Sequence, residues 1–202
     1  MNASRPALDV SGLPDVTFGH KSLVWLGQVG MMAIESTMFA IMIAAYFFLR
    51  TRVTDWPPGV LPPVIMWGAL NTGVFLLSAI PNQWIKHVAQ RGELSKVLLG
   101  LVIMTLIGIV NIVLRGYEFA ALNCKWDWNA YSSAVFILLG FHTAHLFTDW
   151  LDTVVLMVLM FTDSGYEGKR FNDVFENAEY WYFIIFWQVV VFAVIDFAPR
   201  VL

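Results

Sequence analysis

The sequence predicts an all-α, polytopic membrane protein with five transmembrane helices in a single domain, residues 1–202. Hydrophobic residues make up 58% of the chain and charged residues only 13%, and the mean hydropathy is +0.67, outside the range of soluble globular proteins. Apolar runs long enough to cross roughly 30 Å of hydrocarbon recur about five times. After an N-terminal cytoplasmic segment of residues 1–21, we expect the spans near residues 22–50, 64–90, 94–116, 129–161 and 178–198.

The first two runs have clear boundaries. The first ends at Arg50, where the sequence TRVTDWPPGVLPP supplies four prolines that cannot continue a helix and a tryptophan suited to the headgroup level. The second run contains Pro81, but the sequence after it, NQWIKHVAQRG, keeps the helical period. We therefore expect a kinked second helix that reaches Gly92.

The later runs are separated by polar segments. The third begins near Ser95, ends at Arg115 and carries Gly100 and Gly108, which suit close packing against a neighbouring helix. The segment EFAALNCKWDWNA then leads to the fourth run, and its two tryptophans suit the membrane interface. The most charged stretch, TDSGYEGKRFNDVFENAEYW, precedes the core of the fifth run. We expect it to be a loop that returns the chain to the cytoplasm.

The charges predict an orientation, and the charge and cysteine content argue against three features. If the five spans alternate, the N-terminal side carries seven of the twelve Lys and Arg residues, which places the N-terminus in the cytoplasm. With a net charge of -3 and no basic run, the sequence does not predict nucleic acid as a partner. Cys124 is the only cysteine, so neither an internal disulfide nor a cysteine-based metal site is expected.

Glu35 is the residue that fits least easily into hydrocarbon. It lies about fourteen residues from either end of the first run, near the middle of the membrane at about 1.5 Å of rise per residue. An unpaired charge there costs several kcal/mol, so burial favours the neutral carboxyl and makes the residue a functional candidate. Two interpretations stay open: a hydrogen bond that joins two helices, or a group that exchanges protons or holds a lipid or water.

The stretch GFHTAHLFTDWLD places His142, His145, Asp149 and Asp152 on one face of a helix, at spacings of three, four and three. Two imidazoles and a carboxylate on successive turns are a candidate site for a transition metal. However, only Glu35 on another span offers a comparable ligand, and a closed site needs about four. We therefore favour a packed polar seam. Haem is not expected, because bis-histidine ligation needs histidines on facing helices.

Other polar residues occur within the second and third runs, namely Asn71, Thr72, Asn111 and Arg115, and Glu118 follows the last of these by three positions. Hydrogen bonds between helices are the common use of single Asn and Thr side chains in membranes. Arg115 and Glu118 have the spacing of an ion pair on one helix face. We expect these residues to join helices.

Four stretches, in order along most of the chain, resemble subunit III of the haem-copper respiratory oxidases, the cytochrome c and quinol oxidases. GMMAIESTMFAIMIAAYF resembles the family helix in which a Glu is followed by Phe and Tyr, and LNTGVFLLSA resembles the Leu-Asn-Thr stretch. IGIVNIVLRGYEF resembles the helix that ends in Glu-Tyr or Tyr-Glu, and GFHTAHLFTDW resembles the Gly-Phe-His-Gly-x-His motif.

The resemblance implies the short form of this family, with five helices in two groups around a lipid-filled cleft. It implies a bacterial inner-membrane protein with a cytoplasmic N-terminus and a periplasmic C-terminus. Such a chain has no catalytic centre and binds no haem or copper, which belong to partner subunits, whereas structural phospholipids are expected. Its main partner is oxidase subunit I, beside other oxidase subunits, and membership of a larger respiratory supercomplex stays open.

The function implied is that of an accessory subunit, which stabilises subunit I and assists its proton supply during aerobic electron transport. Glu35 matches the buried family glutamate near the lipids. The buried protonatable or lipid-cleft candidates are Glu35, His142 and His145, with both histidines expected beside Glu35 where the first and fourth helices meet. The secondary polar candidates are Asn71, Arg115, Glu118 and Asp149.

The chain also departs from the family pattern. Residues 180–185 read YWYFII where the last family helix carries a His and an Asp, and Thr143 replaces a Gly of the histidine motif. These departures indicate a divergent branch, and one such branch accompanies nitric oxide reductases as a subunit III-like partner. Two alternatives of other classes also stay open: a free-standing membrane transporter or channel, and an independent metal-dependent membrane enzyme. The sequence has neither the internal repeat nor the paired broken helices that are typical of secondary transporters.

Overall fold

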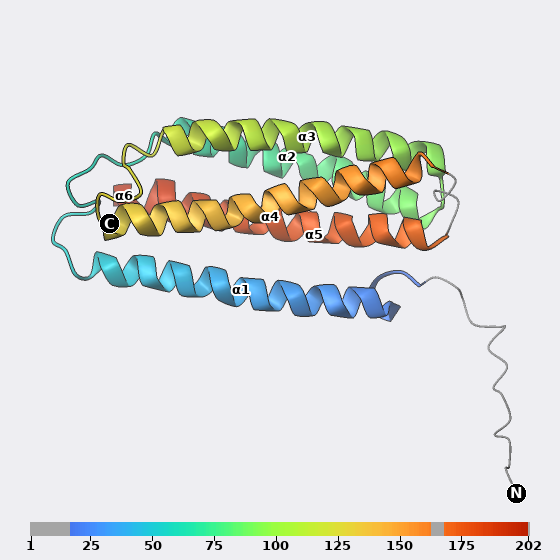
Figure 1. Cartoon of the computed structure of the whole chain (residues 1–202), viewed down its shortest axis with the longest axis horizontal. Coiled ribbons are helices and arrows are strands. Elements are labelled where there is room, and N and C mark those ends of the chain that lie inside the picture. The colour runs from blue at the N-terminus through green and yellow to red at the C-terminus, as the bar shows by residue number, and fades with distance from the viewer. Residues whose placement is uncertain (1–16, 163–167, 202) are drawn as a thin grey trace, which may run out of the picture.

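Five long helices lie side by side, each antiparallel to the one before it in the chain, and α1 lies apart from the other four (Figure 1). The computed structural model describes residues 17–162 and 168–201, and every regular element within these ranges is helical. A short 3-10 turn, η1 (Gly19–Lys21), precedes the first helix, and α5 continues through a π-helical segment, η3 (Ala193–Phe197), into α6 (Ala198–Val201). The long helices are α1 (Leu23–Arg50), α2 (Ile65–Gln90), α3 (Leu94–Ala120), α4 (Ala130–Met160) and α5 (Gly168–Phe192).

Four helices are long and apolar enough to cross a membrane. They are Leu23–Arg50, Leu94–Ala120, Ala130–Met160 and Gly168–Val201. The remaining helix, α2, is less apolar, but it has a similar length and packs between α3 and α5. Its polar side chains are buried against these neighbours, which removes them from lipid. The predicted all-helical membrane fold with five helices is confirmed, and the protein is an integral membrane protein.

The helix ends agree with the expected spans except at α3 and α5. Helices α1, α2 and α4 each begin and end within one residue of the expected range, and α2 continues through Pro81. Helix α3 extends to Ala120, which brings Glu118 into the helix. Residues 1–16 of the expected cytoplasmic segment and residues 163–167 of the expected loop lie outside the described part of the chain.

Helix α5 begins at Gly168, ten residues before the expected start of the fifth span, so part of the charged stretch is helix and not loop. The physical reason is amphipathicity. Phe171, Val174, Phe175 and Ala178 recur at helical spacing and are buried against the ends of α2, α3 and α4. The polar residues between them lower the mean hydropathy without breaking the helix.

The helices divide into two groups, one helix against four. Helices α2 to α5 form a bundle, whereas α1 packs mainly against α4 and α5. Only Phe39 and Tyr46 of α1 are fully buried, and both lie in its C-terminal half. Phe39 stacks on Trp187 of α5 at a ring separation of 4.3 Å, and the indole of Trp56 donates to the hydroxyl of Tyr46 at 3.0 Å. The C-terminal half of α1 is therefore anchored more firmly than its N-terminal half.

The predicted close packing at two glycines of α3 is confirmed. A Cβ atom at Gly100 would lie 2.8 Å from the side chain of Ile85, and one at Gly108 would lie 2.3 Å from Cδ1 of Trp150 on α4. The indole of Trp150 cannot swing away freely, because its Nε1 donates to the carbonyl of Thr105 at 3.1 Å. Gly108 therefore sets how closely α3 and α4 approach.

Gly108→Ala is expected to lower the stability of the folded protein by about 1–3 kcal/mol, the usual cost of overpacking. The measurement is the thermal midpoint of the detergent-solubilised protein, followed by tryptophan fluorescence. Gly116→Ala is the matched control on the same helix, because no atom lies within 4 Å of its added Cβ. The control should leave the midpoint unchanged or raise it, since Ala favours a helix over Gly. Equal midpoints for the two variants would contradict the packing argument.

Candidate functional site

A buried arginine joins α3 to α4 and α5. The side chain of Arg115 is 1% exposed, and its Nη1 donates to Oε2 of Glu118 at 2.9 Å, so the ion pair expected from their spacing is confirmed. Its Nη2 donates to Nδ1 of His142 at 2.9 Å and also to Oε1 of Gln188. We call Arg115, Glu118, His142, Gln188 and Asn71 the arginine cluster.

The other contacts of the arginine cluster extend it to α2. The amide of Asn71 donates to the same Oε2 atom of Glu118 at 3.0 Å, and the amide of Gln188 donates to Oγ1 of Thr72 at 3.0 Å. The side chains of Asn71, Thr72, Glu118 and Gln188 are all buried. Each of the helices α2, α3, α4 and α5 therefore contributes a polar side chain to one network, which compensates for the burial of Arg115.

The contacts of His142 determine its tautomer. Nε2 lies 3.1 Å from the carbonyl oxygen of Ile184, which can only accept, so Nε2 carries the hydrogen. Nδ1 is then the acceptor of the Arg115 hydrogen bond. A neutral His142 satisfies both contacts, and neither ring nitrogen is left to ligate a metal or a haem iron.

Glu35 lies at the contact of α1 with α4 and α5. The hydroxyl of Tyr180 donates to its Oε2 at 2.8 Å, and Nε2 of His145 lies 3.4 Å from its Oε1, a distance typical of an ion pair and longer than most hydrogen bonds. On the other side of the imidazole, Nδ1 of His145 donates to the carbonyl of Phe141 at 2.7 Å. We call Glu35 and His145 the glutamate–histidine pair.

The glutamate–histidine pair is arranged so that a proton can lie between its two groups. Because Nδ1 of His145 already carries a hydrogen, a neutral ring would present a lone pair at Nε2 toward the carboxylate of Glu35. A proton on either group removes this repulsion, giving a neutral pair or an ion pair. The pair can therefore hold and exchange a proton by a shift between two neighbouring atoms.

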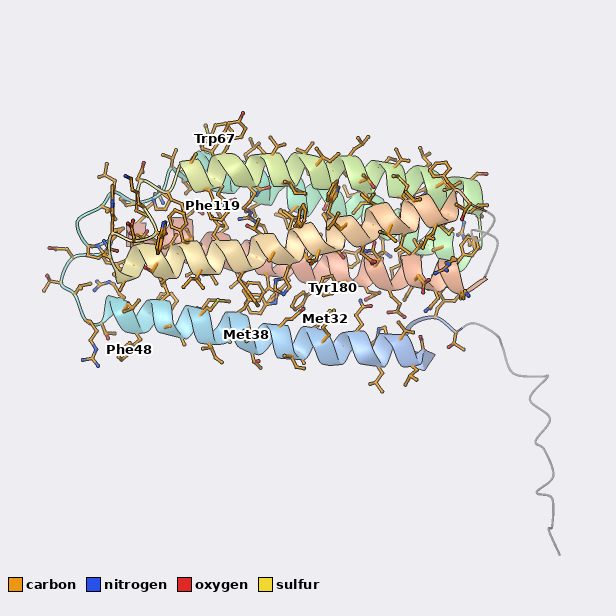
Figure 2. The ribbon with its side chains drawn as sticks, in the orientation of Figure 1. Met32, Met38, Phe48, Trp67, Phe119 and Tyr180 are labelled. Atoms are coloured by element: carbon orange, nitrogen blue, oxygen red, sulfur yellow. The ribbon has the colours of Figure 1, made fainter. Side chains whose placement is uncertain are left out.

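A cleft opens between the N-terminal half of α1 and the facing parts of α4 and α5. Its volume is about 540 Å³, and we call it the α1 cleft. Figure 2 shows Tyr180 between the bundle and α1, near Met32. Five carboxyl side chains line the cleft, against a single basic one, Arg170. The carboxyl residues are Glu35, Asp149, Asp152, Asp173 and Glu176.

The two aspartates of the histidine-containing stretch share one partner. The amide of Asn177 on α5 lies 3.2 Å from Oδ1 of Asp149 and 3.3 Å from Oδ2 of Asp152. The carbonyl oxygen of Asn177 accepts from the hydroxyl of Thr153 at 3.1 Å. The amide nitrogen thus faces both carboxyl groups, and among the described residues no hydrogen bond joins either aspartate to His145.

The four residues of the predicted polar seam therefore meet different partners. His145 lies beside Glu35, but His142 does not, so the expectation that both histidines accompany Glu35 is wrong for His142. The reason is rotation about α4: residues three apart differ by about 60° in direction, enough to turn one histidine into the bundle and the other toward α1.

Asn111 is buried, but neither of its amide atoms has a hydrogen-bond partner among the described residues.

Several residues of the site lie on α5 and were not predicted from the sequence. They are Glu176, Asn177, Tyr180 and Gln188. The sequence carries one signal for them, because positions 176, 180, 184 and 188 recur every four residues and Gln188 is polar within an apolar run. The aromatic stretch YWYFII makes this four-residue spacing hard to recognise, because within the described contacts Tyr180 is the only one of its aromatic residues that contacts the carboxyl of Glu35.

The side chains of the site are not arranged as ligands for a metal ion or a haem. In residues 17–162 and 168–201, no group of three or more His, Cys, Asp or Glu side chains is arranged to hold a metal ion. Both nitrogens of His142 are engaged within the protein, and those of His145 face the Phe141 carbonyl and Glu35. The described arrangement suits proton exchange and helix association.

The chain is similar over most of its length to one named protein subunit from several bacteria. It is 26% identical over 182 residues to the cytochrome c oxidase subunit 3 of Synechocystis sp., covering 88% of this chain and 76% of the relative. It is 21% identical over 181 residues to that of Thermostichus vulcanus, covering 90% of each, and 24% identical over 169 residues to that of Corynebacterium diphtheriae, covering 81% and 82%. No family model matches the chain.

Proposed function

The chain belongs to the subunit III family of the haem-copper respiratory oxidases, and from this premise we propose that it is the accessory subunit III of a respiratory terminal oxidase. It stabilises the catalytic subunit I, its main partner, and assists the supply of protons to that subunit. Haem and copper reside in the partner subunits. The relatives are named as oxidase subunits, which favours this function over a nitric oxide reductase partner or a free-standing transporter.

The glutamate–histidine pair is the observation that supports the role in proton supply. Glu35 and His145 lie 3.4 Å apart near the middle of the first span, where α1 meets α4 and α5, next to an acidic cleft. With the N-terminus in the cytoplasm of a bacterium, as the charge distribution predicts, the α1 cleft lies at the cytoplasmic end of the helices. Protons for oxygen reduction would then reach the pair through carboxyl groups of this cleft.

The α1 cleft also supports a role for structural phospholipids. Its lining combines the carboxyl groups with apolar side chains of α1 and α4, such as Met31, Val155 and Leu159. The N-terminal half of α1 buries no apolar side chain completely. A lipid in the cleft would supply the packing that α1 lacks there and hold it against the bundle.

The experiment that tests the function is purification of the tagged chain from its native membranes in a mild detergent. The chain is expected to co-elute with a larger subunit that carries the haem spectrum of an oxidase. A strain without the chain should yield an oxidase that keeps this spectrum but loses activity sooner during turnover. Elution of the chain as a colourless oligomer, with no haem-bearing partner, would rule the proposal out.

A further inference from the structure

We infer that the interior of the bundle binds ordered water on both sides of the Arg115 guanidinium, at one site beside Asn111 and at another between Glu118 and Asp196. The inference concerns this chain alone and does not depend on the proposed function. The bound water completes the hydrogen bonds of the arginine cluster and joins the cluster to the C-terminal segment η3.

Buried polar atoms without a partner gather in and beside the arginine cluster. They are Oδ1 of Asn71, both amide atoms of Asn111, Nε of Arg115, Oε1 of Glu118 and Oδ2 of Asp196, none of which has a hydrogen-bond partner in the described part of the protein. None of these five side chains is more than 3% exposed. Buried polar atoms are nearly always hydrogen-bonded, because burial of an unpaired polar group is costly. These atoms therefore require a partner from outside the chain.

The first site lies on α3, one helical turn from Arg115. Asn111 precedes Arg115 by four residues, so the two side chains share a face of the helix about 6 Å apart along its axis. The contacts of the guanidinium with the rest of the cluster use Nη1 and Nη2 and leave Nε to this side. A water molecule here would accept from Nε of Arg115 and form hydrogen bonds with the amide of Asn111.

The second site lies where α2, α3 and η3 meet. The amide nitrogen of Asn71 and Nη1 of Arg115 both donate to Oε2 of Glu118, so the unpartnered oxygens of Asn71 and Glu118 lie beside this contact. Gly68, one turn before Asn71 on α2, allows the close approach of Asp196, since an added Cβ atom would lie 2.6 Å from its Oδ2. The charges of Glu118 and Arg115 act on the Asp196 carboxyl group. The unpartnered atoms of this site are all acceptors.

The atoms of the first site identify water as the ligand. Nε of Arg115 and Nδ2 of Asn111 are donors, whereas Oδ1 of Asn111 is an acceptor. A cation would satisfy only the acceptor and an anion only the donors, but a water molecule accepts and donates. Buried water typically makes about three hydrogen bonds to such groups. A lipid headgroup is excluded, because these side chains face the interior of the bundle.

The charges around the second site also favour a neutral ligand. Glu118 pairs with Arg115, and the guanidinium of Arg200 donates to the backbone carbonyl of Asp196 and lies close enough for its charge to act on the Asp196 carboxyl. Two carboxyl groups are thus accompanied by two guanidinium groups, and a bound cation would leave an excess of positive charge inside the bundle. Water supplies hydrogen-bond donors without adding charge.

The experiment is a high-resolution cryo-electron microscopy map of the unchanged protein, purified from its native membranes with its co-eluting subunits. Samples are prepared in sodium chloride and in choline chloride. We expect density at hydrogen-bond distance, about 2.7–3.2 Å, from Nε of Arg115 and from Oε1 of Glu118 in both samples. Missing density at either atom would overturn the inference for that site. Density beside Glu118 in sodium chloride alone would assign that site to a cation and contradict water there.

Two variants at Asn111 test the first site by the order of their stabilities. Serine keeps a hydroxyl that can bind water, whereas valine does not, and the two have similar helix propensities. With water bound, Asn111→Ser should melt about 2–4 °C above Asn111→Val, the shift expected in a chain of this length for one hydrogen bond. In a dry interior the order would reverse, because valine would leave no unpaired polar atom. The reverse order would therefore overturn the inference.

Val113→Ser is the matched control, because Val113 lies on the exposed face of the same helix, outside both sites. Its thermal midpoint should not rise above that of the unchanged protein. A rise equal to the difference between the two Asn111 variants would trace that difference to helix propensity and contradict its assignment to water. If the Asn111 variants do not assemble, the density in the unchanged protein decides the question.

Discussion

Replacement of Arg115 by methionine is expected to destabilise the helical bundle by about 3–5 kcal/mol, the cost of breaking a buried ion pair on one side. The guanidinium contacts Glu118, His142 and Gln188 from a fully buried position. Without it, the carboxylate of Glu118 keeps only the amide of Asn71 among the described donors, and Nδ1 of His142 loses its donor. An uncompensated charge would then lie inside the membrane.

The measurement is the amount of folded chain in membranes, together with its thermal midpoint after solubilisation. Arg91→Met is the matched control, because Arg91 is exposed at the end of α2 and should tolerate the change. The double variant Arg115→Met with Glu118→Gln should recover much of the loss, since it removes both charges together. If Arg115→Met alone melts like the unchanged protein, the arginine cluster is not what joins these helices.

Glu35→Gln is expected to lower either the turnover rate of the oxidase or the number of turnovers before inactivation, by up to about tenfold. The haem spectrum should stay unchanged. A general acid or base that acts directly on the substrate raises a reaction rate by about 10²–10⁴-fold, so a smaller effect on the rate is expected for a group that assists from an accessory subunit. Gln preserves the shape of the site: its carbonyl can accept from Tyr180, and its amide can donate to Nε2 of a neutral His145. The substitution therefore removes the exchangeable proton and retains the contacts.

Two controls separate proton exchange from packing. Tyr180→Phe deletes the hydroxyl that donates to Glu35 but leaves the glutamate–histidine pair able to hold its proton, so its effect on turnover should be smaller. Glu93→Gln changes a half-buried carboxyl before α3 that pairs with Lys96 and lies outside the site, so it should have no effect on turnover. The assay is oxygen consumption by the purified complex across successive additions of reductant. An unchanged turnover rate and an unchanged number of turnovers before inactivation in Glu35→Gln would contradict a role of this residue in proton supply.

The span positions follow from the sequence because hydrocarbon thickness and hydropathy act locally along the chain. The ends of α1, α2 and α4 were predictable for that reason, and so was the pairing of Arg115 with Glu118, which the geometry of one helix determines. Glu35 was predictable as an unusual residue, since an acid near the middle of a span needs a partner whatever the fold. Helix α5 was only partly predictable, because polar residues at its start resemble a loop in composition.

Tertiary structure alone decided which side chains meet. The histidine-containing stretch shows four polar residues on one helical face, but not that His142 turns toward Arg115 while His145 turns toward Glu35. Those contacts depend on the rotation of each helix about its axis and on the neighbour it packs against, which local sequence patterns do not encode. The same holds for Tyr180 and for the acidic cleft beside α1, since both arise only where helices distant in sequence come together.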